Sequence, residues 1–251
     1  MKLIQVPTSQ GSLDKNLGCE QAPQVICENK KSETVKVVPS NIEATDEAIY
    51  LKAKKVFSKK ETAIFIGGDH AITYGLAKAF SEEFGNPSLI IFDAHADADV
   101  FFKPVSHQDL NRAMIEEKLI EKERLMIIGL RKIFEVEKPF LKKHKIKNIS
   151  ADEIHKNFEG AKEKLSKFLS EQKNIYLSID IDALDPSIAP GTGYLEENGL
   201  TEKEFFELLE MILGSGKIRA SDLVEMNPKL DEKEKTIKIG KKILEKLTSQ
   251  L

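Results

Sequence analysis

Residues 88–97 read Ser-Leu-Ile-Ile-Phe-Asp-Ala-His-Ala-Asp, an apolar run that ends in acidic and imidazole side chains. The apolar half of this stretch predicts a buried strand. In extended backbone the side chains alternate between two faces, so Asp93, His95 and Asp97 would project to one side. Two carboxylates and an imidazole on one face suit a divalent cation. Asp is also common in turns and loops, so this stretch alone leaves both interpretations open.

Length and composition limit the classes of protein to which the chain can belong. A chain of 251 residues suits one large α/β domain over residues 1–251 and does not require two. With 41% hydrophobic and 31% charged residues it is typical of a soluble globular protein. The net charge of −3 gives no reason to expect nucleic acid or a membrane surface as a partner.

Neither a membrane-spanning run nor a signal-peptide pattern occurs in the sequence, so we expect a cytoplasmic location. The two cysteines, Cys19 and Cys27, are expected to be reduced and structural.

Apolar runs and helical patterns alternate along the chain. Strands are predicted at residues 2–6, 33–38, 63–66, 88–92, 125–128, 146–149, 175–179 and 218–224. Helices are predicted at residues 41–58, 71–84, 110–119, 135–145, 160–172, 201–213 and 232–247. Strands that alternate with helices favour a mostly parallel α/β sheet with helices on both faces.

Polar residues follow several of the predicted strands directly. His70, Asp93, Asp180 with Asp182, and Glu225 all stand at or just beyond a strand end. Ligands of parallel α/β proteins gather beyond the carboxyl ends of the strands. We therefore expect these side chains to converge on one pocket.

Six of the converging side chains are candidate metal ligands. They are His70, Asp93, His95, Asp97, Asp180 and Asp182. The four carboxylates would repel one another or take up protons unless two divalent cations neutralised them. Six ligands suffice for two metals if carboxylates bridge ions about 3.5–4 Å apart, as in two-metal hydrolases. The absence of thiolate ligands favours Mn²⁺ over Zn²⁺ or Cu²⁺ without settling the metal.

Four sequence blocks resemble the signature blocks of the ureohydrolase family, which contains arginases, agmatinases, guanidinobutyrases and formimidoylglutamases. The blocks are Gly67–His70, Asp93–Asp97, Ser178–Pro186 with Pro190–Gly193, and Asp222–Pro228. The resemblance extends from about residue 18 to residue 228. It implies a three-layer α/β/α fold, two Mn²⁺ per chain, a trimer or hexamer, and cleavage of a guanidino compound to urea and an amine.

The resemblance also implies which side chains hold each ion. One ion would be held by His70, Asp93, Asp97 and Asp180. The other would be held by Asp93, His95, Asp180 and Asp182. Asp93 and Asp180 would bridge the two ions.

Three residues match catalytic positions of the family. Asp97 would orient the attacking water, Glu225 would pair with the guanidinium, and His107 would protonate the leaving amine. A lone loop histidine is otherwise commonly incidental, and His144 and His155 match no motif, so we expect these two at the surface.

The loop segment Gly191-Thr-Gly193 either shapes the site or forms a structural turn.

Departures from the family pattern bear on the substrate. After Gly129-Leu-Arg131, arginases usually carry carboxylates that bind the α-amino group, whereas this chain has Lys132-Ile-Phe134. The pattern from Ser106 to Arg112 is similar to that of short microbial agmatinases. We therefore expect agmatine to be cleaved to putrescine and urea. An arginase, a guanidinobutyrase or a non-catalytic metal-binding homologue remain the alternatives.

Overall fold

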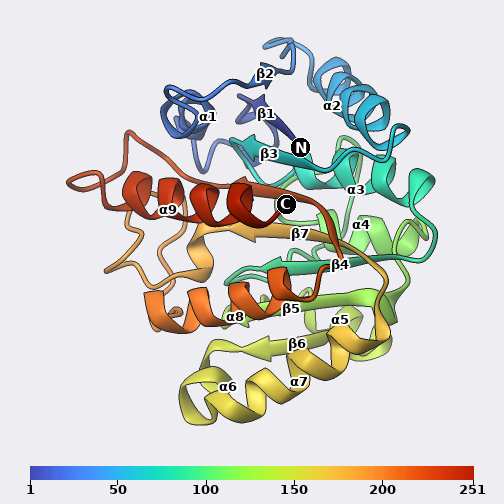
Figure 1. Ribbon diagram of the computed structural model, residues 1–251, viewed down its shortest axis with the longest axis vertical. Coiled ribbons are helices and arrows are strands. Elements are labelled where there is room, and N and C mark those ends of the chain that lie inside the picture. The colour runs from blue at the N-terminus through green and yellow to red at the C-terminus, as the bar shows by residue number, and fades with distance from the viewer.

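The computed structural model describes all residues from 1 to 251 and contains one eight-stranded sheet in which every strand pair is parallel. The strand order is β2-β1-β3-β8-β7-β4-β5-β6, from the top to the bottom of Figure 1. The strands are β1 (Lys2–Val6), β2 (Glu33–Thr34), β3 (Ala63–Gly67), β4 (Pro87–Phe92), β5 (Leu125–Leu130), β6 (Lys147–Ser150), β7 (Asn174–Asp180) and β8 (Ile218–Val224).

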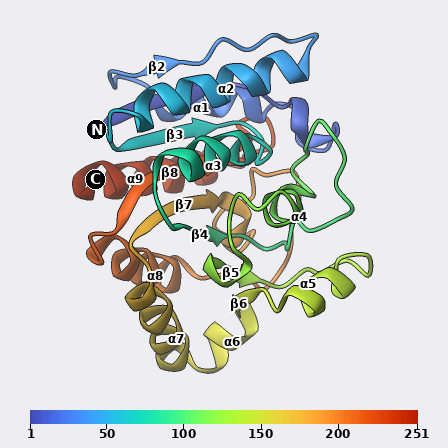
Figure 2. The ribbon, with the colours of Figure 1, turned by 90° about the vertical axis from the view of Figure 1, so that its right-hand side faces the viewer.

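Helices cover both faces of this sheet (Figures 1 and 2). One face carries α1 (Ala22–Ile26), α6 (Ala151–Lys156), α7 (Phe158–Glu171), α8 (Glu202–Gly214) and α9 (Lys235–Gln250). The other carries α2 (Ile42–Phe57), α3 (Ile72–Glu83), α4 (Leu110–Glu116) and α5 (Lys138–His144). The expected three-layer α/β/α fold is confirmed.

Alternating side chains of the central strands divide the interior into two cores. In β4, Ile90 and Phe92 belong to the core shared with α8, whereas Leu89 and Ile91 belong to the core shared with α3. This is the face alternation of extended backbone, and it explains why a strand buried on both faces reads as an uninterrupted apolar run.

The predicted strand at 33–38 is wrong beyond its second residue, since β2 ends at Thr34. The Val35 N–H still donates to the Gln5 carbonyl of β1 at 2.9 Å. Farther on, the Val38 N–H donates instead to the Thr45 hydroxyl of α2 at 2.9 Å. The Val38 N–H is therefore bonded to the start of α2 and is not available to pair with a neighbouring strand.

Helix ends also differ from those predicted. Helix α5 begins at Lys138 and not at Glu135, with Pro139 in its first turn, where the missing N–H of proline costs nothing. The short helices α1 and α6 were not predicted, because five and six residues are too few for a helical period to show.

Cys19 and Cys27 are buried and unpaired, as expected. No helix in the structure combines the length and the apolar character needed to cross a bilayer.

Candidate active site

Four neighbouring strands deliver the candidate site residues. Strands β3, β8, β7 and β4 are adjacent in the sheet. His70 follows β3, Glu225 follows β8, Asp180 ends β7 and Asp93 follows β4. Their side chains meet because the carboxyl ends of four parallel neighbours lie along one edge.

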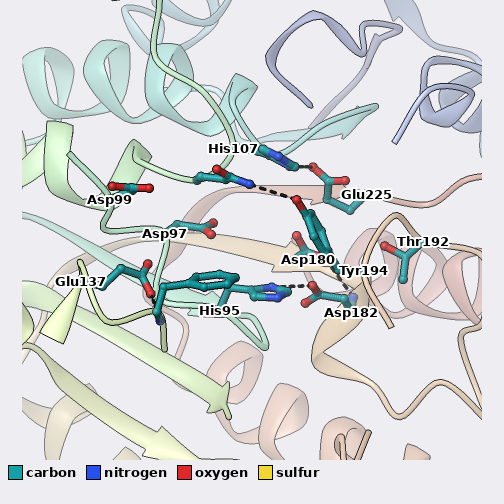
Figure 3. Close-up of a pocket in the computed structure, with 12 residues that line it drawn as sticks. His95, Asp97, Asp99, His107, Glu137, Asp180, Asp182, Thr192, Tyr194 and Glu225 are labelled. Atoms are coloured by element: carbon teal, nitrogen blue, oxygen red, sulfur yellow. Dashed lines mark hydrogen bonds and ion pairs between the residues drawn. The ribbon is translucent and has the colours of Figure 1, made fainter. Parts of the chain in front are cut away.

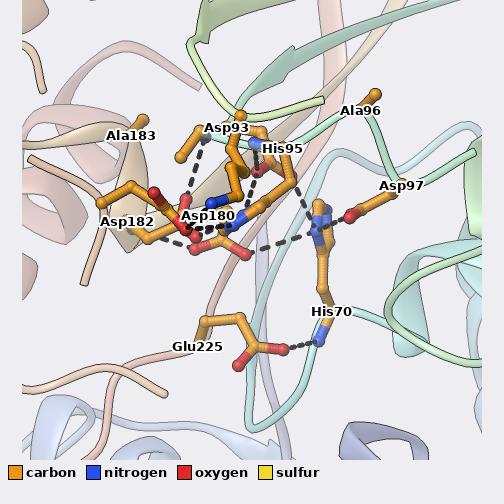
Figure 4. A network of polar contacts seen from close by, with 12 residues as sticks. His70, Asp93, His95, Ala96, Asp97, Asp180, Asp182, Ala183 and Glu225 are labelled. Atoms are coloured by element: carbon orange, nitrogen blue, oxygen red, sulfur yellow. Dashed lines mark hydrogen bonds and ion pairs between the residues drawn. The ribbon is translucent and has the colours of Figure 1, made fainter. Parts of the chain in front are cut away.

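The structure brings all six predicted metal ligands together (Figure 4). The His70 Nδ1 lies 3.1 Å from Asp93 Oδ2, 3.0 Å from Asp97 Oδ2 and 3.4 Å from Asp180 Oδ2. A second group forms around the His95 Nδ1, which lies 2.9 Å from Asp182 Oδ2 and 3.5 Å from Asp93 Oδ1.

The two groups share Asp93. One comprises His70, Asp93 and Asp180, and the other comprises Asp93, His95 and Asp182. Within each group the candidate ligand atoms lie within 4.8 Å of one another. This arrangement suits two cations that share a bridging carboxylate.

The donor set fits divalent cations for a second reason. His70 Nδ1 and Asp93 Oδ2 are buried and have no hydrogen-bond partner, so each has a lone pair free for a metal. Burial and the charge of Asp93 raise the pKa of Asp97 to about 7. Burial and the charges of Asp182 and Asp93 raise the pKa of Asp180 well above its usual range. Cations in the pocket would relieve this crowding of negative charge.

Local hydrogen bonds fix the orientation of the ligand side chains. The backbone N–H of His95 donates to Asp93 Oδ1 at 2.6 Å, and the backbone N–H of Asp182 donates to Asp180 Oδ1 at 2.9 Å. Behind His70, its Nε2 lies 3.0 Å from the Ser178 hydroxyl, which donates to Asp222 at 2.6 Å. The imidazole of His70 therefore has its Nδ1 directed to the carboxylates and its Nε2 held from behind.

Asp97 and Glu225 both have left-handed backbone conformations, with φ of 46° and 63°. Such a conformation costs a non-glycine residue about 1–3 kcal/mol unless the surroundings enforce it. The Asp97 carbonyl accepts a hydrogen bond from the Asn111 N–H at 2.9 Å, and the Glu225 N–H donates to the Gly68 carbonyl at 2.7 Å. These backbone hydrogen bonds hold the two residues in the left-handed conformation.

Only glycine fits at position 68, because a Cβ there would lie 1.9 Å from the Thr8 carbonyl oxygen.

Glu225 and His107 are direct partners, which the sequence did not indicate. The His107 Nδ1 lies 3.3 Å from Glu225 Oε1, and His107 Nε2 is buried without a hydrogen-bond partner. Burial opposes protonation of His107, but pairing with Glu225 raises the pKa of the imidazole. Glu225 also accepts a hydrogen bond from the backbone N–H of His70 at 2.7 Å and one from the Asn16 side-chain amide at 2.6 Å.

A pocket opens over these residues (Figure 3). His107 and Glu225 lie on one side of it, and His95 and Asp182 on the other. Tyr194 lies between the two histidines, with its ring centroid 5.4 Å from that of His95 and 5.8 Å from that of His107. No lysine or arginine lines the pocket. Its carboxylates are Asp97, Asp99, Glu137, Asp180, Asp182 and Glu225.

Comparison with known proteins agrees with this geometry. The family model described as Arginase family matches residues 1–249. The chain belongs to the arginase family. An arginase from Bacillus subtilis (strain 168) is 30% identical over 224 residues, which cover 83% of this chain and 76% of that relative. A guanidinobutyrase from Pseudomonas aeruginosa is 33% identical over 184 residues, which cover 71% of this chain and 57% of that relative.

The fold is shared with relatives over nearly the whole chain. The crystal structure of the arginase from Bacillus subtilis superimposes with a TM-score of 0.87 at 26% sequence identity. The superposition covers 98% of this chain and 97% of that one. The ureohydrolase resemblance of the sequence blocks is thereby confirmed at the level of the arginase family.

Several residues in or around the pocket of this arginase-family chain were not predicted. Asn16, Asp99 and Tyr194 lie in irregular segments, where no hydrophobic period marks a position. Ser178 and Asp222 lie within the sequence blocks that resemble the family, and this position was the only sign in the sequence that they contribute to the site. We predicted no function for either residue.

The loop Gly191–Gly193 both borders the pocket and forms a close turn. Thr192 lines the pocket, and a Cβ on Gly191 would lie 2.7 Å from the Cβ of Asp231, so this loop needs glycine for close approach.

The two histidines that match no motif lie away from the site. His155 is exposed and His144 stacks on Phe140 in α5, and neither lines the pocket.

Proposed function

We propose that this arginase-family chain is a binuclear manganese hydrolase that cleaves agmatine to urea and putrescine. The observation that carries the proposal is the pair of candidate metal groups sharing Asp93 in a pocket lined by carboxylates and by no lysine or arginine. Arginine or 4-guanidinobutyrate cleavage would use the same metal residues and differ only in contacts to the substrate tail.

Metal ions held by the six ligands would supply a nucleophile at neutral pH by lowering the pKa of a water molecule. Asp97 has a carboxylate oxygen directed to the His70 group and lines the pocket, so it can orient the attacking water. Glu225 lies across the pocket with an ionised carboxylate, since pairing with His107 lowers its pKa despite burial. A planar guanidinium can pair with this carboxylate, which would place its carbon near the two metal groups.

The leaving amine must depart with a proton, and His107 is the group placed to provide it. Its Nδ1 is held by Glu225, and its Nε2 has no partner in the protein. A protonated imidazole held in this way can donate from Nε2 to the amine nitrogen. The raised pKa of His107 favours the protonated form before transfer.

The charge of the pocket wall supports agmatine over its carboxylate-bearing relatives. Agmatine ends in an ammonium group alone, 4-guanidinobutyrate ends in a carboxylate, and arginine ends in both an ammonium and a carboxylate. Asp99 lines the pocket and offers a negative charge to an ammonium tail. The nearby Lys132 lies 3.7 Å from Glu196, so its charge is offset. A carboxylate tail would meet the negative charge of Asp99 and would be disfavoured by repulsion.

Urea release from a panel of guanidino compounds tests the substrate. With manganese-loaded protein, we expect agmatine to give a larger kcat/KM than arginine or 4-guanidinobutyrate, because its tail carries an ammonium group and no carboxylate. Chelator-treated protein without added metal serves as the control. A clear preference for arginine or 4-guanidinobutyrate would replace agmatine as the substrate, and no urea from any compound would favour a non-catalytic metal-binding protein.

Replacing Glu225 by glutamine tests its role in substrate binding. We expect kcat/KM to fall about 100-fold, the equivalent of about 3 kcal/mol, because a charge-assisted pair with the guanidinium is lost. Both metals should stay bound, since Glu225 belongs to neither candidate metal group. Steady-state kinetics with metal analysis would check this, and loss of metal from the variant would show that Glu225 is a ligand.

A further inference from the structure

His95 requires a hydrogen-bond acceptor on the side away from the metal groups. Its Nδ1 faces Asp182 and Asp93 at 2.9 and 3.5 Å. A neutral imidazole that offers Nδ1 to a metal must carry its proton on Nε2. The His95 Nε2 is buried and has no hydrogen-bond partner. Metal-binding histidines almost always donate this second N–H to a carboxylate, a carbonyl or water.

The carboxylate that approaches His95 Nε2 is Glu196, whose Oε1 lies 3.7 Å away. The Lys132 ammonium lies 3.7 Å from the same oxygen. The side chain of Glu196 is 24% exposed, so solvent screens these charges only in part.

The backbone around Glu196 is tied to the backbone of a metal-group residue. The Arg131 guanidinium donates to the Glu196 carbonyl at 2.9 Å and to the Asp182 carbonyl at 2.6 Å. Arg131 therefore fixes Glu196 and Asp182 relative to each other on the two sides of the His95 ring. Tyr194, in the same loop as Glu196, contacts the ring edge-on.

We propose that Glu196 is a positioning residue for His95: it accepts a hydrogen bond from the Nε2–H and thereby keeps Nδ1 free and aimed at the metal. The inference rests on the proposed binuclear centre and is independent of the substrate. A carboxylate in this position typically contributes 10- to 100-fold in metal affinity. The effect should be confined to the Asp93–His95–Asp182 group, because Glu196 approaches His95 and none of the residues around His70.

A two-step Mn²⁺ titration of the purified full chain, followed by calorimetry and by the EPR signal of free Mn²⁺, tests the proposal. We expect Glu196→Ala to weaken one binding step about 10- to 100-fold and to leave the other unchanged. His95→Ala should affect the same step. Glu196→Gln, which keeps an acceptor oxygen but not the charge, should show a smaller loss. Glu197→Gln, the exposed neighbour in the same loop, is the matched control and should titrate like wild type.

Circular dichroism melts would show whether each variant folds, and Glu196→Gln serves if the alanine variant does not. Unchanged affinity at both steps in a folded Glu196 variant would overturn the role of Glu196 while leaving the binuclear centre intact. Equal weakening of both steps would overturn it too, because positioning of His95 predicts a selective loss. A wild-type chain that saturates at one ion would overturn both this inference and the proposed centre.

Discussion

Replacement of His107 by asparagine is expected to lower turnover by about two to four orders of magnitude while both metal ions stay bound. The reason is the need of the leaving amine for a proton. Of the other acidic groups of the pocket, Asp180 and Asp182 belong to the candidate metal groups, and Glu225 is held ionised by its pairing with His107. Glu137 accepts hydrogen bonds from the backbone N–H groups of Ala98 and Phe134. His107 lines the pocket with a buried Nε2 that has no partner and a Nδ1 held by Glu225, so it is placed to make this transfer.

Steady-state urea release and metal analysis of the same preparation would measure this effect. His155→Asn is a suitable control, because His155 is exposed and lies outside the pocket. Asparagine preserves a polar side chain of similar reach, so the substrate should still bind. Near-wild-type turnover at neutral pH with full metal content would show that water or another group delivers the proton.

Replacement of Asp93 by alanine is expected to remove both metal ions and to reduce urea release to the uncatalysed background. Asp93 is the one residue that belongs to both candidate metal groups, with Oδ2 near His70 and Oδ1 near His95. Loss of its charge also eases the repulsion among the remaining carboxylates, so we expect the variant to fold.

Metal content after dialysis, measured beside a thermal melt, would check the Asp93→Ala result. Asp152→Asn in α6 provides a folded control with one fewer exposed carboxylate. Retention of two ions by the Asp93 variant would mean that the bridging assignment is wrong. Loss of metal together with loss of the melting transition would instead point to a structural role.

The order of the blocks along the chain and the apolar runs that precede them allowed much of the fold to be predicted. A run such as 88–92 can be buried on both faces only within a covered parallel sheet, so its carboxyl end had to lie at the ligand-binding edge. The six predicted metal ligands followed from that rule and from the charge that the carboxylates carry. The sequence could not indicate that β3, β8, β7 and β4 are neighbours, because pairing depends on contacts between distant segments.

The residues around the metal groups were harder to predict for a physical reason. Asn16, Tyr194 and Glu196 stand in segments without regular secondary structure, and each reaches the site through a contact with a residue far away in the chain. A hydrophobic period reports only which face of an element is buried, and these segments have none. The pairing of His107 with Glu225 was also not predicted, because 118 positions separate the two residues along the chain.

The most direct test of the account is the number of manganese ions that the chain binds at saturation. Two ions per chain for the wild type, and one for Asp182→Ala, are expected from two ligand groups that share Asp93. A wild-type stoichiometry of one that Asp182→Ala leaves unchanged would contradict the binuclear centre.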